Sequence, residues 1–224
     1  MNREWADLCT LKQEQLKKKE TFEEGIKNLL LLRSTLLKQM NQFRNEITCE
    51  EFSEMPFMNA KGYENKTVAY SLYHVFRIED IVTNTIIRKK EEIFFSENYQ
   101  KRMNASIITT GNELMKEQIG EFSAKLNLDE LYNYIKEVDQ STTKLIQSFK
   151  MEDMKIKMTE EDKKAVRSLH VVSEDPCAEW LVNYWCNKNI LGLIQTPLSR
   201  HWLMHIKPCL KMIEKIKKNR TLGK

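Results

Sequence analysis

Glycine and proline are scarce in this chain, which has 6 glycines and 4 prolines among its 224 residues. A sheet-rich fold of this length would need more turn-forming residues, so the shortage argues against a protein built from strands and hairpins. Leucine, lysine, glutamate, isoleucine and methionine are abundant instead, and most of these are good helix formers. We therefore predict an all-α protein, long enough for one domain with a substantial core.

A strong excess of charge and long apolar runs are also missing. The 36 basic and 32 acidic residues leave a net charge of +4, which gives little electrostatic drive for binding nucleic acid. The longest apolar run, LLLL at 29–32, is far shorter than the ~18 residues that span a bilayer, and the charged N-terminus does not resemble a signal peptide. We expect a protein that binds neither nucleic acid nor membranes.

The five cysteines are odd in number and show no CxxC spacing. A disulfide framework normally uses an even number of cysteines, so these are expected to be reduced thiols. Reduced thiols are typical of an intracellular protein, and the predicted location is therefore cytoplasmic.

Apolar residues recur every three or four positions along most of the chain, a spacing that predicts amphipathic helices. The first helix runs from about Trp5 to Asn45, but its early part is polar, and packing is expected to begin near Phe22. A connection punctuated by proline, glycine and asparagine follows over about residues 47–66. Later helices are expected at about 113–126 and 128–149, and from Thr159, Pro176 and Thr196, with Gly192 ending the helix that begins at Pro176.

No internal repeat or low-complexity linker divides the chain. The prediction is one helical domain over residues 1–224, with a polar N-terminal extension over about 1–20 and a basic tail over about 214–224. A solvated helix end explains the basic tail without a binding partner.

The helix expected to open at Thr67 has almost no polar face. Its apolar residues surround nearly the whole circumference, which is typical of a helix in the interior of a protein. His74 lies in the first two turns of this helix, and the interior position makes it a candidate for a buried polar site.

Two more histidines, His201 and His205, are four residues apart on the last predicted helix. They differ by about 40° around the helix axis and about 6 Å along it, so both lie on one face. Leu198, Met212 and Ile213 continue that face, which places the two imidazoles toward the core. Buried imidazoles need partners, which are either ordinary hydrogen-bonding groups or a shared metal ion.

An HxxxH pair is not a complete metal site. Zinc proteases carry a glutamate after the first histidine, whereas Trp202 stands there in this chain, which argues against a metalloprotease. His74 is the best candidate for a third ligand. The three rings would meet at one end of a bundle if the two helices ran side by side in the same direction.

The segments YSLYHVFRIEDIV and WLVNYWCNKNILGLIQTPLSRHWLMHI resemble the DinB-like family of bacterial four-helix bundles. That family has one histidine early in the second bundle helix and an HxxxH pair in the last, and His74, His201 and His205 fall on these positions. The resemblance covers about residues 20 to 215.

This resemblance implies a four-helix bundle with one long crossover and extra short helices, with the second and last helices parallel. It also implies a divalent metal ion, Zn or Ni, held by the three histidines with coordination positions left open. Related families include transferases and isomerases that use low-molecular-weight thiols. A metal-activated thiol or water nucleophile is therefore the implied chemistry, and members are often homodimers.

Several neighbouring residues are assigned ordinary roles. Pro208 removes a helical hydrogen bond after His205 and is expected to kink or loosen the helix. Cys209 is expected to be a small core residue and His170 a surface residue. Arg77 is expected to pair with a carboxylate, and Glu79 points away from His74. Most of the nearby aromatic residues are expected in the core: Trp180, Trp185, Trp202, Tyr73 and Tyr184.

Two functions remain open from the sequence. The first is a metal-dependent transferase or hydrolase that activates a thiol or water. The second is a non-catalytic helical bundle with a structural or degenerate metal site, such as a dimerisation or stress-response protein.

Overall fold

The computed structural model describes residues 3–58, 60 and 66–222. Helices and turns make up nearly all of these ranges, and no strand is formed within them. The all-α prediction is confirmed. Asn59, Gly62 and Asn65 of the predicted 47–66 connection, and the last two residues of the predicted basic tail, lie outside the described residues.

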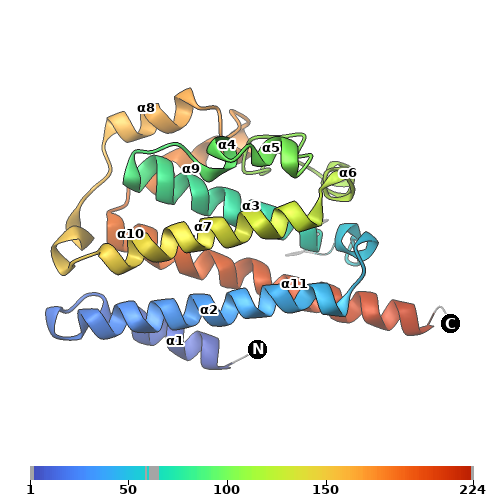
Figure 1. The fold of residues 1–224 in the computed structure, drawn as a ribbon, viewed down its shortest axis with the longest axis horizontal. Helices are drawn as coiled ribbons and strands as arrows, with labels where there is room; N and C mark the ends of the chain where they lie inside the picture. Colours follow the sequence, from blue (N-terminus) through green and yellow to red (C-terminus); the bar gives the residue numbers. More distant parts are fainter. Residues whose placement is uncertain (1–2, 59, 61–65, 223–224) are drawn as a thin grey trace.

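Four long helices pack side by side in a bundle (Figure 1). They are α2 (Phe22–Glu46), α3 (Val68–Asp80), α7 (Leu128–Ser148) and α11 (His201–Leu222). Helix α3 contacts α7 and α11, and α2 contacts the same two helices, so the four form a ring around the core. Helix α3 also continues into a π-helical segment, η3 (Ile81–Arg88).

The directions of these helices correct one expectation. Helices α2 and α11 run one way and α3 and α7 the other, so the second and last bundle helices are antiparallel (Figure 1). The long crossover over residues 89–127 returns the chain to its starting end, and it is α7 that becomes parallel to α3.

The histidines can still meet because other helical segments precede α11, so His201 does not lie at the end of the bundle. The short helix α10 (Ile190–Gln195) and the π-helical η5 (Thr196–Arg200) precede it. His201 therefore lies about three turns into a nearly continuous helical path. It faces α3 along the side of the bundle, and a parallel neighbour is not needed to bring His74 close.

Short helices fill the connections. The crossover contains α4 (Ile93–Ser96), α5 (Tyr99–Arg102) and α6 (Glu117–Lys125). The connection from α7 to α11 also contains η4 (Met151–Lys155), α8 (Glu160–Ser168) and α9 (Pro176–Cys186). Two single 3-10 turns, η1 (Lys19–Thr21) and η2 (Glu50–Ser53), flank α2.

The N-terminal extension is packed, which corrects the expectation that packing begins near Phe22. Helix α1 (Arg3–Gln15) lies along α2, and Trp5 is buried in the main core. Gly25 allows the close approach, since a β-carbon there would lie 2.9 Å from the backbone nitrogen of Leu16. The polar composition misled the prediction because only one narrow stripe of α1 is buried.

The predicted helix starts at Thr67 and Thr159 are confirmed. The Thr67 hydroxyl accepts from the amide of Tyr70 at 3.0 Å, and Thr159 forms a reciprocal capping box with Asp162. The predicted end at Gly192 is wrong. Helix α9 stops at Cys186, and Asn189 then caps α10 by accepting from the Gly192 amide at 2.9 Å, so the glycine lies inside the new helix.

The aromatic predictions hold for Tyr73, Trp185 and Trp202, which are fully buried. They fail for Trp180 and Tyr184, which are exposed and pack edge to face against each other on α9. Other parts of the protein cover only one side of helix α9, so Trp185 is buried while Trp180 and Tyr184 face outward. None of the described helices combines the length and apolarity needed to cross a membrane.

Candidate metal centre

Helix α3 is interior along its whole length, as the sequence predicts. Each residue from Val68 to Asp80 is buried, including five with polar or charged side chains besides the tyrosines: Ser71, His74, Arg77, Glu79 and Asp80. Burial makes each of these polar groups depend on a partner inside the protein. Ser71 donates to the Thr67 carbonyl at 2.8 Å, and the partners of the other four divide them into two structural networks and one histidine cluster.

The structure brings His74, His201 and His205 together. The ring centre of His74 lies 5.1 Å from that of His201 and 4.7 Å from that of His205, and the latter two are 4.6 Å apart. One nitrogen from each ring lies within 4.8 Å of the others. His74 and His205 are buried, whereas His201 is partly exposed and is the member of the cluster nearest to solvent.

The tautomer of His74 follows from its partner. Its Nδ1 lies 2.8 Å from the carbonyl oxygen of Thr110. A carbonyl can only accept a hydrogen bond, so Nδ1 must carry the proton and Nε2 keeps a free lone pair. A histidine that donates one ring nitrogen to a carbonyl and presents the other to a metal is the usual arrangement in metal sites.

His201 and His205 each contain a buried Nδ1 without a hydrogen-bond partner among the described residues. Leaving such atoms unpaired is costly, which is why buried polar atoms usually have partners. Two of them beside a third imidazole fit a site that takes a ligand.

The three imidazoles are also held neutral. Burial lowers the pKa of His74 to about 4, although its hydrogen bond to Thr110 opposes the shift. Burial and the neighbouring imidazoles, together with Lys66, lower the pKa of His201 and His205 well below the usual value. Neutral imidazoles are the form that binds metal ions, so the cluster is ready to coordinate at neutral pH.

The donor set passes a simple test of fit. Three neutral nitrogen ligands suit zinc or nickel and leave further positions of the ion open. Within the described ranges, this is the one group of three histidine, cysteine or carboxylate ligands close enough to share an ion. Cys209, one turn beyond His205, does not belong to it and is a buried core residue, as predicted, with its pKa raised to about 12 by burial.

Pro208 does not separate the two histidines of α11. The helix is continuous from His201 to Leu222 and passes through Pro208, and the two imidazoles remain neighbours. His170, predicted to be a surface residue, is exposed and lies 3.7 Å from Glu174.

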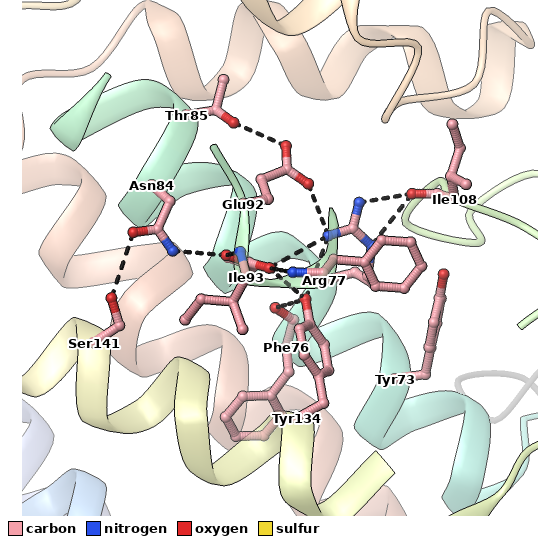
Figure 2. A network of polar contacts seen from close by, with 12 residues as sticks. Tyr73, Phe76, Arg77, Asn84, Thr85, Glu92, Ile93, Ile108, Tyr134 and Ser141 are labelled. Carbon is pink, nitrogen blue, oxygen red and sulfur yellow. Dashed lines mark hydrogen bonds and ion pairs between the residues drawn. The ribbon is translucent and has the colours of Figure 1, made fainter. Parts of the chain in front are cut away.

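Arg77 pairs with carboxylates, as predicted. Its guanidinium lies 2.9 Å from Glu92 and 3.7 Å from Asp80, all three fully buried (Figure 2). Tyr134 donates to Asp80 at 2.9 Å and completes the network. Glu92, Tyr134 and the Ile108 carbonyl take the three nitrogens of the guanidinium, which leaves Arg77 without the free donors that an anionic substrate would need.

A second buried network supports the start of α11. Arg33 forms a two-pronged pair with Glu79, at 2.7 and 3.0 Å, and also contacts Asp139 at 2.7 Å. Glu79 accepts from the indole of Trp202 at 2.7 Å, and Arg33 donates to the Leu198 carbonyl at 2.8 Å. The residues on both sides of His201 are thereby fixed, a link that the sequence spacing did not reveal.

Comparison with known proteins identifies a similar fold and no family. No family model matches the chain, and no curated protein matches it. Among solved structures, the chain is similar to a conserved protein from Enterococcus faecalis, with a TM-score of 0.56 and 12% sequence identity over 96% of this chain and 97% of that one. At this identity the likeness shows the fold alone.

Proposed function

We propose that this protein is a metal-dependent enzyme of the DinB-like type, in which a divalent ion held by three histidines activates a thiol or water. The observation behind the proposal is the buried cluster of three neutral imidazoles, with two unpartnered nitrogens and a third ring oriented by Thr110. The positions of these histidines also match the pattern of the DinB-like family. Zinc and nickel are the ions that suit this donor set.

The chain's own residues would divide the work. His74, His201 and His205 would hold the ion, and Thr110 orients the first of them through its carbonyl. A bound divalent ion supplies Lewis acidity, which lowers the pKa of a coordinated thiol or water and provides a nucleophile at neutral pH. The partly exposed His201 leaves one side of the cluster open for a small substrate, for which a low-molecular-weight thiol is the proposed class.

The test of this function is a thiol conjugation assay with an electrophilic small molecule, run on protein loaded with zinc or with nickel. The proposal expects turnover by the loaded protein and none by His205→Ala loaded in the same way. Cys209→Ala is the matched control, because it truncates a buried side chain one turn further along the same helix and leaves the three histidines in place. Equal rates for wild type and His205→Ala would contradict the proposal.

A structural metal site is the second candidate function. The deep burial of His74 and His205, at 5% and 8% exposure, favours it because little of the ion would reach solvent. In that case chelation would lower the melting temperature, and no thiol-dependent or hydrolytic activity would accompany the metal. Such a site would stabilise the bundle or contribute to a homodimer.

The proposed location of the protein is the cytoplasm. All five cysteines are free thiols in the structure, and Cys49 and Cys177 are exposed. Exposed free thiols persist in a reducing compartment, whereas secreted proteins usually pair them.

A further inference from the structure

Helix α3 binds a stretch of irregular backbone, residues 107–111, one carbonyl after another. The Tyr73 hydroxyl lies 3.0 Å from the carbonyl of Ile107 and 3.1 Å from that of Thr109. Arg77 donates to the carbonyl of Ile108 through two nitrogens, at 2.7 and 3.2 Å. Each of the carbonyls of residues 107–109 is therefore bound by a side chain of α3.

The remaining two carbonyls of this segment complete the pattern. His74 donates to Thr110 at 2.8 Å, and the Tyr70 hydroxyl donates to Gly111 at 3.1 Å. Five consecutive carbonyls thus accept from four side chains of one helix. The segment forms no regular secondary structure. Local hydrogen bonds run from the Leu114 amide to the Gly111 carbonyl at 3.1 Å and from the Gly111 amide to the Thr109 hydroxyl at 3.3 Å, and the side chains of α3 tie the segment to the bundle.

Arg77 is the firmest of the four anchors. Its guanidinium is fully buried, paired with Glu92 at 2.9 Å, and lies 4.0 Å from the ring centre of Phe94 (Figure 2). Tyr134 lies within 3.3 Å of the same group. Figure 2 shows the Arg77 guanidinium between Glu92 on one side and the Ile108 carbonyl on the other. An arginine held at so many points keeps a fixed position for the carbonyl that it binds.

The position of Thr110 connects this clamp to the histidine cluster. Its carbonyl is the acceptor that sets the His74 tautomer, and it lies between the carbonyls bound by Tyr73 and Arg77 and the one bound by Tyr70. If the segment shifted by even an ångström, the Nδ1 proton of His74 would lose its acceptor. The proton could then move to Nε2, which would remove the lone pair that a metal needs.

We propose that Tyr73 and Arg77 are positioning residues for the histidine cluster. By holding the carbonyls of residues 107–109, they keep the Thr110 carbonyl where it fixes His74 with its proton on Nδ1 and its Nε2 lone pair toward the other two rings. The part of this inference that concerns metal affinity rests on the proposed function. The part that concerns the tautomer does not.

The experiment compares Tyr73→Phe with Tyr132→Phe. The first removes only the hydroxyl that contacts the segment. The second removes another buried tyrosine hydroxyl, which donates to the Met40 carbonyl at 2.9 Å instead of to residues 107–111. Nitrogen-15 NMR of the metal-free proteins reads the tautomer of His74, and titration with zinc reads the affinity.

The expected result is that wild type and Tyr132→Phe hold His74 with the proton on Nδ1, whereas Tyr73→Phe populates the other tautomer. Zinc affinity should fall roughly tenfold in Tyr73→Phe and stay unchanged in the control, because groups that orient ligands typically contribute this much. Arg77→Lys, which keeps the charge beside Glu92 but loses the fork to Ile108, should act in the same direction and serves if Tyr73→Phe does not fold.

Three results would overturn the inference. They are a wild-type His74 with its proton on Nε2, an unchanged tautomer in both the Tyr73 and Arg77 variants, and a zinc affinity that falls equally in the control. A wild-type protein that binds no zinc would contradict the proposed function instead, and the tautomer comparison would still decide the positioning role.

Discussion

The histidine cluster and the Arg33 network are both polar groups buried in the same bundle, yet they differ in how their atoms are satisfied. In the network, the two terminal nitrogens of Arg33 bind Glu79, Asp139 and a backbone carbonyl, while its Nε lacks a partner among the described residues, and Glu79 also accepts from Trp202. In the cluster, three imidazoles of one chemical type face one another, and two of their nitrogens lack partners among the described residues.

The contrast distinguishes polar groups that stabilise the fold from polar groups that are suited to bind a ligand. A buried network in which a guanidinium pairs with carboxylates and a backbone carbonyl holds helices in place and has no need of a further molecule. A buried cluster of neutral imidazoles with unpartnered nitrogens is a poor way to stabilise a bundle. It is a good way to hold a cation, and the neighbouring network gives it a rigid frame.

The largest expected effect comes from breaking the network. Arg33→Met leaves the buried Glu79 carboxylate without its cation, and we expect this to cost about 3–5 kcal/mol in the free energy of unfolding. Urea unfolding of the metal-free protein measures it. The double variant Arg33→Met/Glu79→Gln should recover part of the loss, and a single-variant cost below about 1 kcal/mol would show that the network is not structural.

The second effect is a pH dependence of the free energy of unfolding, which arises from the histidine cluster. The unfolded imidazole takes up a proton near pH 6.5, whereas folded His74 stays neutral until about pH 4. The metal-free protein should therefore lose stability as the pH falls from 6.5 to 4, by about 3 kcal/mol from this group, with no contribution above that window. The loss should be smaller by this amount in His74→Gln, and parallel pH curves for the two proteins would contradict it.

Removing one ligand gives the next effect. His205→Ala should weaken zinc binding by about 100-fold or more, equivalent to about 2.7 kcal/mol, while helicity by circular dichroism stays as in wild type. Because the variant also removes an unpartnered Nδ1, the metal-free protein should unfold at nearly the same urea concentration. A variant that loses its helices would place His205 with the structural network instead.

The smallest effect is expected at the histidine outside the cluster. His170 is exposed, and its contact with Glu174 is a surface pair. His170→Ala should change the free energy of unfolding by less than about 0.5 kcal/mol and leave zinc affinity as it is. A loss of metal in this variant would mean that binding does not require the three-histidine arrangement.

Much of the fold was readable from the sequence because it depends on local signals. The helix starts at Thr67 and Thr159 and the apolar circumference of α3 depend on residues a few positions apart, and all three predictions are confirmed. The pairing of His201 and His205 was also predicted, because i and i+4 on an inward face leave few alternatives. The inclusion of His74 came from its interior position and from the family resemblance.

The rest depends on contacts between distant residues. Arg33 and Glu79 are 46 residues apart, and nothing in either helix marks them as partners. The helix directions were misjudged because they follow from the path of the crossover. The segment 107–111 shows no pattern of its own, since its backbone carbonyls make the contacts and carbonyls look the same in every sequence.

The most direct test of the central claim is the metal content of the protein purified without an affinity tag, measured by elemental analysis before and after soaking with zinc and with nickel. A site built from His74, His201 and His205 predicts about one divalent ion per chain in wild type and its loss in His205→Ala. Wild-type protein that retains no zinc or nickel after soaking, or a variant that retains as much as wild type, would contradict the account.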